Sequence, residues 1–239
     1  MTEAPVLYEK TSDGVACITL SRPAVLNAMN LEVRDLLWSY MQAVRDDPEV
    51  RAVVFKGAGE RAFSAGADIR EFGTAPSYID ARRARRDRDV WGAMLEITKP
   101  MVAAMHGFVF GAGCELSLFC DIRICSEDAT FALPEVALGY IPSAGGTQML
   151  PRLIPPGIAR QMIYSGQPID AQRALAAGLV HRVVSRASLH DEARAIAVKA
   201  AALPEAAVQG AKEAMLRGAC LPLDQALAVE RGIAARVAV

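Results

Sequence analysis

Residues 63–68, Phe-Ser-Ala-Gly-Ala-Asp, and residues 110–115, Phe-Gly-Ala-Gly-Cys-Glu, form two short glycine-bearing turns. Each follows an apolar, strand-like run, at residues 52–55 and 101–105, and leads into a helix-like stretch. This order leaves backbone N–H groups free at the start of a helix, where they can face a developing negative charge. The two turns therefore predict a site that stabilises an anion.

The chain around these turns alternates between strands and helices. The expected strands are residues 8–10, 15–20, 51–55, 101–105, 122–125 and 179–184. Asn30 is a suitable N-cap for a helix from Leu31 to about Arg45, and a further helix should follow Gly113. Pro204 and Pro222 mark two later helix starts. The pattern predicts an α/β protein with helices packed on the faces of a sheet.

Composition and charge exclude several classes of protein. The 239 residues are 52% hydrophobic and 6% aromatic, which is typical of a packed, alanine-rich domain. A formal charge of −1 gives no electrostatic footprint for nucleic acid or an anionic membrane. The five cysteines are scattered without a Cys-x-x-Cys pair, which favours buried thiols in a reducing compartment over disulfides or a metal site.

Three further segments bear on whether the chain contains a membrane span, a signal peptide or a nucleic-acid surface. Residues 101–120 are long enough to span a bilayer, but three glycines and Glu115 interrupt them, so a buried strand–turn–helix fits better. The first residues lack the pattern of a signal peptide, and a cytoplasmic location without membrane attachment is expected. Residues 75–94 form a charged, helical insert. Its arginines at 82–88 are interleaved with aspartates, which favours a solvated helix face over a nucleic-acid surface.

Two glutamates stand alone in apolar surroundings. Glu115 is the one charged side chain between Lys99 and Asp121, with His106 neutral, and Glu135 is the one between Asp128 and Arg152. If both are buried, desolvation raises their pKa toward the working pH, as general acid–base catalysis requires. The alternative is that each pairs with a distant arginine or caps a helix. Their position beside glycine turns favours the catalytic interpretation.

Five motifs together resemble the enoyl-CoA hydratase/isomerase (crotonase) superfamily. They are Arg-Pro-x-x-x-Asn-Ala-Met at 22–29, Phe-Ser-Ala-Gly-Ala-Asp-Ile at 63–69, Gly-x-x-x-Gly-x-Gly-Cys-Glu at 107–115, Pro-Glu at 134–135, and Gly-x-x-Pro-x-Ala-Gly-Gly-Thr-Gln at 139–148. The resemblance implies a spiral of strand–strand–helix (ββα) units at residues 1–185. It also implies a C-terminal helical trimerisation region at 186–239, shortened relative to the family, and a homotrimer or hexamer.

The resemblance also implies a ligand and residue roles. Acyl-CoA is the expected substrate, so coenzyme A enters with it and no separate cofactor is needed. The amides of Ala67 and Ala112 would bind the thioester oxygen, Glu115 would activate water for attack at Cβ, and Glu135 would protonate Cα. The implied substrate-binding residues are Ala24, Leu26, Ala65, Gly66, Asp68, Ile69, Arg70, Gly113 and Ser143.

Three positions differ from the family pattern. Ala112 stands where a glycine is common, Ser143 replaces another glycine, and Ala24 occupies a position that is often basic, for which Arg70 is a substitute. The expected activity is hydration of trans-2-enoyl-CoA. The alternatives are a double-bond isomerase or a hydrolase, an RNA-binding role through residues 82–88, and an acyl-CoA binder or assembly subunit without catalysis.

Overall fold

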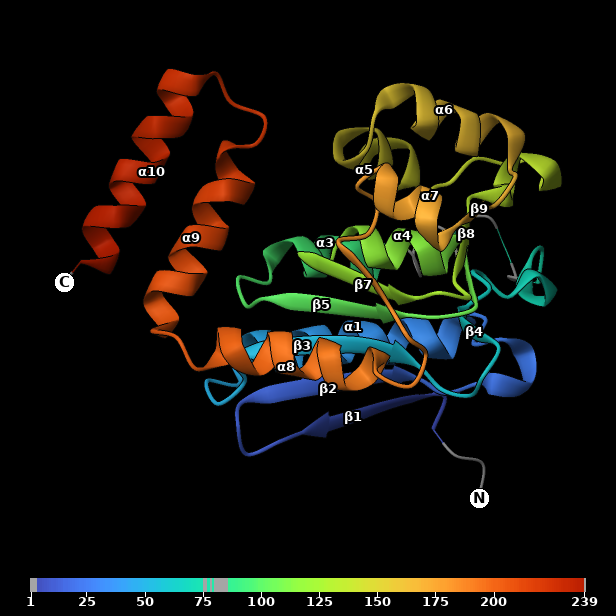
Figure 1. Ribbon diagram of the computed structural model, residues 1–239, viewed down its shortest axis with the longest axis horizontal. Coiled ribbons are helices and arrows are strands. Elements are labelled where there is room, and N and C mark those ends of the chain that lie inside the picture. The colour runs from blue at the N-terminus through green and yellow to red at the C-terminus, as the bar shows by residue number, and fades with distance from the viewer. Residues whose placement is uncertain (1–3, 75–76, 78, 80–85, 239) are drawn as a thin grey trace.

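In a computed structural model, which describes residues 4–74, 77, 79 and 86–238, the chain forms two sheets with helices around them (Figure 1). The longer sheet has the strand order β1-β2-β3-β5-β7-β10, and only its β1–β2 pair is antiparallel. These strands are β1 (Val6–Lys10), β2 (Val15–Leu20), β3 (Ala52–Gly57), β5 (Met101–Met105), β7 (Ile122–Ser126) and β10 (Arg182–Val184).

The shorter sheet has the order β4-β6-β8-β9. Its strands are β4 (Ala62–Ser64), β6 (Phe108–Phe110), β8 (Thr130–Ala132) and β9 (Ile169–Asp170). The chain alternates between the sheets, from β3 to β4, from β5 to β6 and from β7 to β8. Each of these pairs contributes one strand to the longer sheet and one to the shorter sheet, and a helix or loop follows. This is the expected spiral, and the α/β fold class is confirmed.

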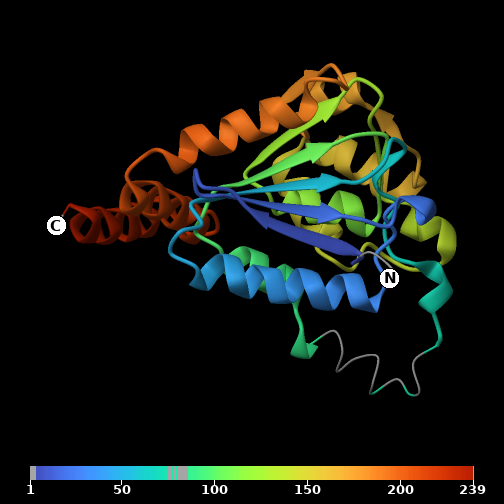
Figure 2. The same cartoon turned by 90° about the horizontal axis from the view of Figure 1, so that it is seen from below.

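Helices cover both faces of the longer sheet (Figure 2). Along β3, Val53 and Phe55 point into the main core, which includes α1 (Leu31–Asp46) and α3 (Val90–Glu96). Val54 faces the other way, toward α8 (Leu189–Ala201). Because successive strand residues point to opposite faces, one buried strand supplies both cores.

The remaining helices lie at the ends of this body. The upper group is α4 (Ala112–Leu118), α5 (Gly146–Leu153), α6 (Pro156–Ser165) and α7 (Ala171–Ala176). The last two helices, α9 (Glu205–Gly218) and α10 (Leu223–Val237), pack on each other and project from the body (Figure 1). The buried Lys212 of α9 anchors the pair, because its Nζ donates to the Lys99 carbonyl and to Asp121.

The sequence predicted the long elements well. Asn30 caps α1 as expected, since its side chain accepts a hydrogen bond from the Val33 amide, and α9 and α10 begin after Pro204 and Pro222. The apolar segment 101–120 consists of β5, β6 and α4, and no helix in the described part of the chain is long and apolar enough to cross a membrane. Of the insert at 75–94, residues 75, 76, 78 and 80–85 lie outside the described residues, and residues 90–94 are helical as expected.

Candidate active site

The site is built at one edge of the shorter sheet. Strands β4, β6 and β8 are neighbours and run parallel, so their carboxyl ends emerge together. The turn with Gly66 follows β4, the turn with Gly111 follows β6, and Glu135 follows β8. Strand pairing therefore brings together the turn with Gly66, the turn with Gly111, which is 45 residues later in the sequence, and Glu135, which is 24 residues later again.

The two glycine turns are in direct contact. A Cβ atom at Gly66, where φ is 98°, would lie 2.9 Å from the Phe110 carbonyl oxygen and 3.3 Å from the Ala112 amide nitrogen. At Gly111, where φ is 51°, it would lie 2.9 Å from Glu135 Oε1. Glycine supplies both the left-handed backbone and the close approach, so the turns and Glu135 pack without intervening side chains.

The Ala67 amide is directed by a short bridge to Met29. In this parallel bridge the Met29 amide donates to the Gly66 carbonyl, and the Asp68 amide donates to the Met29 carbonyl. The N–H of Ala67 therefore points to the opposite side of the turn. Ala112 is the first residue of α4, where the amide has no acceptor within its own helix. Both residues are half-buried.

Glu115 lies in the first turn of α4 and is 2% exposed. Its Oε1 accepts hydrogen bonds from the Ala144 amide (2.9 Å) and the Gly146 amide (2.8 Å). Burial and, to a smaller extent, the charge of Glu135 raise the pKa of this carboxyl to about 7, while hydrogen bonds from the two amides oppose the shift. The expected capping role is thus present too, because Gly146 begins α5. A pKa near 7 suits a group that exchanges protons at neutral pH.

Glu135 is 4% exposed and lies in the short 3-10 helix η3 (Pro134–Leu138). Its Oε2 is buried and has no hydrogen-bond partner among the described residues. Burial raises the pKa of this carboxyl above its usual value. In the described part of the chain neither glutamate forms a salt bridge, so the alternative of pairing with a distant arginine does not occur there.

The loop before α1 holds the first turn in place. Asn27 is buried, and its side-chain amide donates to the Ala58 and Ala62 carbonyls. Leu26 and Asn27 both have positive φ, 56° and 54°, which is strained for residues with a Cβ. The Leu26 carbonyl accepts a hydrogen bond from the Ala65 amide. The motif at 22–29 thus braces the turn at 63–68.

The Asp68 carboxylate is paired with two arginines of the protein. It caps the 3-10 helix η2 (Ile69–Glu71), since its side chain accepts a hydrogen bond from the Arg70 amide. Arg70 and Arg22 donate to it, and these guanidinium groups hold the pKa of the carboxyl well below its usual range. The sequence motif contained Arg22, but nothing in the sequence assigned it this contact.

The other predicted substrate residues divide into two groups. Gly113 is buried against Ser64, and Ala65 is half-buried beside the two turns. Ala24, Ile69, Arg70 and Ser143 are exposed at the surface. The structure therefore brings the backbone positions of the two turns together with both glutamates, and leaves the side chains expected to contact coenzyme A or the acyl group at the rim.

Tyr140 belongs to the site and was missed. Burial and the charges of Glu135 and Glu115 raise the pKa of its hydroxyl. Its ring contacts that of Phe72 edge-on, with centroids 5.3 Å apart, and so links the loops that follow η2 and η3. Its position five residues after Glu135 was the available signal, but a lone tyrosine has no spacing rule that identifies it.

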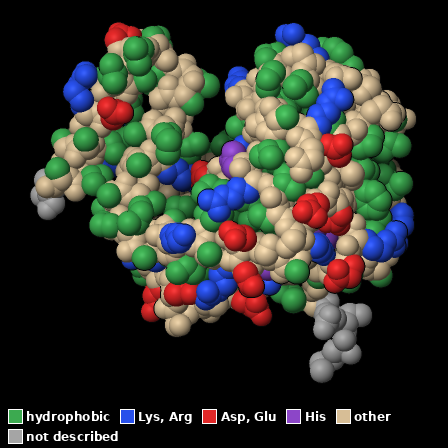
Figure 3. All heavy atoms as spheres, viewed as in Figure 1, with side chains coloured by type: hydrophobic (Ala, Val, Ile, Leu, Met, Phe, Trp, Pro, Cys, Tyr) green, Lys and Arg blue, Asp and Glu red, His purple; other side chains and the backbone are tan. Residues whose placement is uncertain are grey.

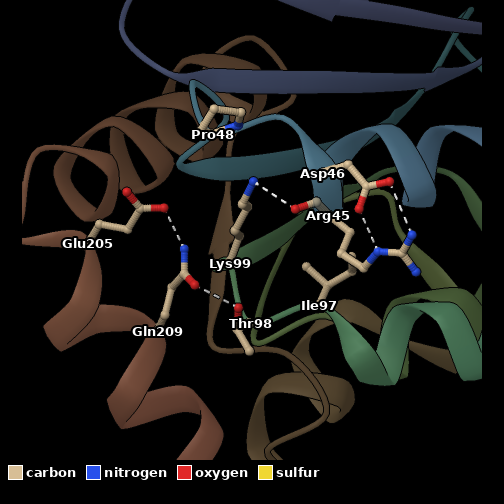
Figure 4. Close-up of a pocket in the computed structure, with 8 residues that line it drawn as sticks. All are labelled: Arg45, Asp46, Pro48, Ile97, Thr98, Lys99, Glu205 and Gln209. Atoms are coloured by element: carbon tan, nitrogen blue, oxygen red, sulfur yellow. Dashed lines mark hydrogen bonds and ion pairs between the residues drawn. The ribbon is translucent and has the colours of Figure 1, made fainter. Parts of the chain in front are cut away.

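A polar hollow elsewhere is structural (Figure 4). Lys99 points into it, and its Nζ donates to the Val44 and Asp47 carbonyls, which end α1. Gln209 of α9 accepts a hydrogen bond from the Thr98 hydroxyl and donates one to Glu205, four residues earlier in the same helix. Of these bonds, the one between Thr98 and Gln209 joins α9 to the body, and those of Lys99 hold the end of α1. In the residues that the structure describes, no group of three or more His, Cys, Asp or Glu could hold a metal ion.

Comparison with known proteins agrees with this geometry. Residues 10–237 match the family model for enoyl-CoA hydratase/isomerase. The chain belongs to the enoyl-CoA hydratase/isomerase family. A short-chain-enoyl-CoA hydratase of Clostridium acetobutylicum is 40% identical over 94% of this chain and 86% of its own length. An (E)-benzylidenesuccinyl-CoA hydratase of Thauera aromatica is 37% identical over 93% and 86%.

Solved structures give the same result for the fold. The crystal structure of an enoyl-CoA hydratase from Bacillus anthracis superposes with a TM-score of 0.90 at 36% identity, over 96% of this chain and 89% of that one. The protein therefore has the crotonase fold and carries out crotonase-family acyl-CoA chemistry. These two relatives, at 40% and 37% identity, are named for different acyl groups, so identity alone does not define the substrate.

Proposed function

We propose that this protein adds water reversibly to trans-2-enoyl-CoA thioesters, giving 3-hydroxyacyl-CoA. The observation that carries the proposal is the meeting of two buried, raised-pKa glutamates with the two glycine turns at the ends of β4, β6 and β8. The hydratases among the relatives support the same reaction class. A site with two carboxylates suits hydration, which needs one group for water and one for carbon.

In the proposed reaction the thioester oxygen accepts hydrogen bonds from the Ala67 and Ala112 amides. As negative charge develops on that oxygen, fixed N–H donors stabilise it more than they stabilise the substrate. Ionised Glu115 takes a proton from water as the oxygen attacks Cβ, and neutral Glu135 gives its proton to Cα. Glu115 ends the reaction protonated and Glu135 ends it ionised. Proton exchange with solvent then returns both carboxyl groups to their starting states.

We assign the residues around the two turns to substrate binding, which is the role that the family resemblance implies. Ala24, Leu26, Ile69 and Arg70 surround the first turn, and we assign them to coenzyme A. Arg70 has a 64% exposed side chain, so its guanidinium can contact a phosphate at the surface while it pairs with Asp68. Ala65, Gly66, Asp68 and Gly113 shape the turns, and the exposed Ser143 lies beside the loop that holds Glu115.

We further propose that residues 1–185 form the catalytic unit and that 186–239 mediate association into a trimer or a pair of trimers. The support is an apolar surface on α9 and α10, where Met215 is 70% and Leu223 75% exposed. Light scattering at micromolar concentration should give the mass of a trimer or hexamer. A monomer would contradict this proposal and leave the catalytic one intact.

The test of the proposed activity is a panel of trans-2-enoyl-CoA thioesters, assayed for hydration with the stereochemistry of the product. A single 3-hydroxyacyl-CoA stereoisomer is expected from at least one substrate. Turnover excludes a binder without catalysis. Double-bond migration without hydration would instead establish the isomerase alternative, and the absence of both reactions would refute the proposal.

A further inference from the structure

A second hollow lies behind the site, between the body and α9. It has a volume of about 290 Å³ and is lined by α3, the end of α4, α5 and α9. Figure 3 shows the surface hollowed between the projecting helices and the upper part of the body. Much of its wall is apolar, including Met94, Leu118, Met149 and Leu153. Such a wall suits an alkyl chain better than a polar ligand.

The polar groups of this hollow already have partners. Arg123 is buried and donates to the Leu179 and Cys120 carbonyls. Lys212 donates to Asp121 and to the Lys99 carbonyl. Because these cations are engaged within the chain, the apolar wall is the part of the hollow that remains for a ligand.

Phe119 lines the hollow and also contacts the loop that holds Glu115. It follows α4 directly, is half-buried and lines the hollow. Its ring packs onto Gly145, where a Cβ would lie 2.7 Å from Phe119 Cζ, and Gly145 stands between the two residues whose amides hold Glu115. On another side the ring is 5.7 Å from that of Trp91, centroid to centroid. Phe119 is thus clamped between α3 and the loop that fixes Glu115.

The direction of the substrate follows from the proposed function. With the thioester oxygen at the Ala112 amide and Cβ beside Glu115, the acyl chain advances along α4 toward its end. The distance from Ala112 to Phe119 is about 10 Å at 1.5 Å per residue, which an extended carbon chain covers with about eight atoms. A longer chain meets the Phe119 ring, with the apolar hollow directly behind it.

We propose that Phe119 sets the acyl-chain length that this site accepts, by closing the passage from the catalytic carboxylates to the apolar hollow. This inference rests on the proposed function, since the position of the thioester fixes the direction of the chain. The substrate class is therefore short- to medium-chain enoyl-CoA. Removal of the ring would connect the hollow to the site and give a longer alkyl tail a place to bind.

The experiment compares kcat/KM for crotonyl-, trans-2-hexenoyl-, trans-2-decenoyl- and trans-2-dodecenoyl-CoA in the intact protein and in Phe119→Ala. In the intact protein we expect kcat/KM to fall at least about tenfold between the hexenoyl and decenoyl substrates, since each excluded methylene costs binding in the transition state. In Phe119→Ala the ratio of decenoyl to crotonyl kcat/KM should rise at least about tenfold.

Two further variants keep the test decisive. Phe119→Leu fills more of the space and should shift the ratio in the same direction by less, which covers a folding defect in the alanine variant. Leu153→Ala enlarges the hollow from α5 without opening the passage, so its chain-length profile should match that of the intact protein. An unchanged profile in both Phe119 variants, or efficient dodecenoyl-CoA hydration by the intact protein, would overturn the inference.

Binding separates this inference from the proposed activity. Calorimetry with saturated butyryl-CoA and dodecanoyl-CoA needs no turnover, and Phe119→Ala should bind dodecanoyl-CoA at least about tenfold more tightly than the intact protein does. That gain without any hydration would support the hollow as a tail site and refute the hydratase proposal. Hydration of crotonyl-CoA with no gain in either assay would refute the role of Phe119 alone.

Discussion

Glu115 and Glu135 lie in two regions that differ in burial and in hydrogen bonding. Every residue of α4 from Gly113 to Leu118 is buried, and two amides of the following loop hold the Glu115 carboxylate. In η3, Glu135 is the one buried residue, the three after it are exposed, and its Oε2 has no partner among the described residues. We infer that the first region fixes a base in position, and that the second presents a proton that no hydrogen bond retains.

The largest effect is expected at the amides of Ala67 and Ala112, which we propose bind the thioester oxygen. Ala67→Pro removes one N–H donor and no side-chain function, so hydration should fall about 10²–10³-fold in a protein that still folds. Ala67→Gly is the matched control, because it keeps the amide and should stay near the original rate. Steady-state kinetics with circular dichroism and thermal melting provide the measurement. A folded proline variant with undiminished turnover would mean that the turn is architectural.

The pH profile should distinguish the two carboxyl groups. Glu115 must be ionised to act as a base, and its pKa is raised to about 7, so kcat/KM should rise about tenfold per pH unit below pH 7. Glu135 must be protonated, so the rate should fall again at higher pH, where its own raised pKa is passed. Rates at saturating and at low substrate give the profile. A flat profile from about pH 5 to pH 8 would contradict these roles.

Stability should respond unequally to loss of the two carboxylates. Glu115→Leu leaves the Ala144 and Gly146 amides without their acceptor, which should lower the free energy of unfolding by about 1–3 kcal/mol. Glu135→Leu removes an oxygen that had no partner, and its cost should stay below about 1 kcal/mol. Glu115→Gln keeps an acceptor oxygen and is the control. Urea unfolding measures all three, and equal losses at the two positions would remove the distinction.

The sequence predicted the long elements and the chemistry of single residues. Helical periodicity and the Asn30 cap identified α1, and isolation in apolar segments made Glu115 and Glu135 candidates for burial, which the structure confirms. The shorter sheet was missed, because strands of two or three residues such as β4 and β6 carry no readable alternation. That sheet is what brings the turns together, so the contact of Gly66 with the Ala112 region could not be deduced from local pattern.

Side-chain partners at the site were equally hidden. The pairing of Asp68 with Arg22 spans 46 residues of sequence, and the bond from the Gly146 amide to Glu115 spans 31. Local rules describe neighbours within a few residues, whereas these contacts depend on how the two sheets are stacked. The family resemblance supplied the expected roles of these positions but not the contacts.

We propose that Glu115 and Glu135 act together on an enoyl-CoA thioester. The most direct test is the hydration rate of crotonyl-CoA in the intact protein, Glu115→Gln and Glu135→Gln, with butyryl-CoA affinity measured in parallel. Each variant should lose at least about 10²-fold in rate, as expected for a general acid or base, while affinity changes little because the oxygen donors are backbone amides. Near-normal hydration by Glu135→Gln would contradict the two-carboxylate account.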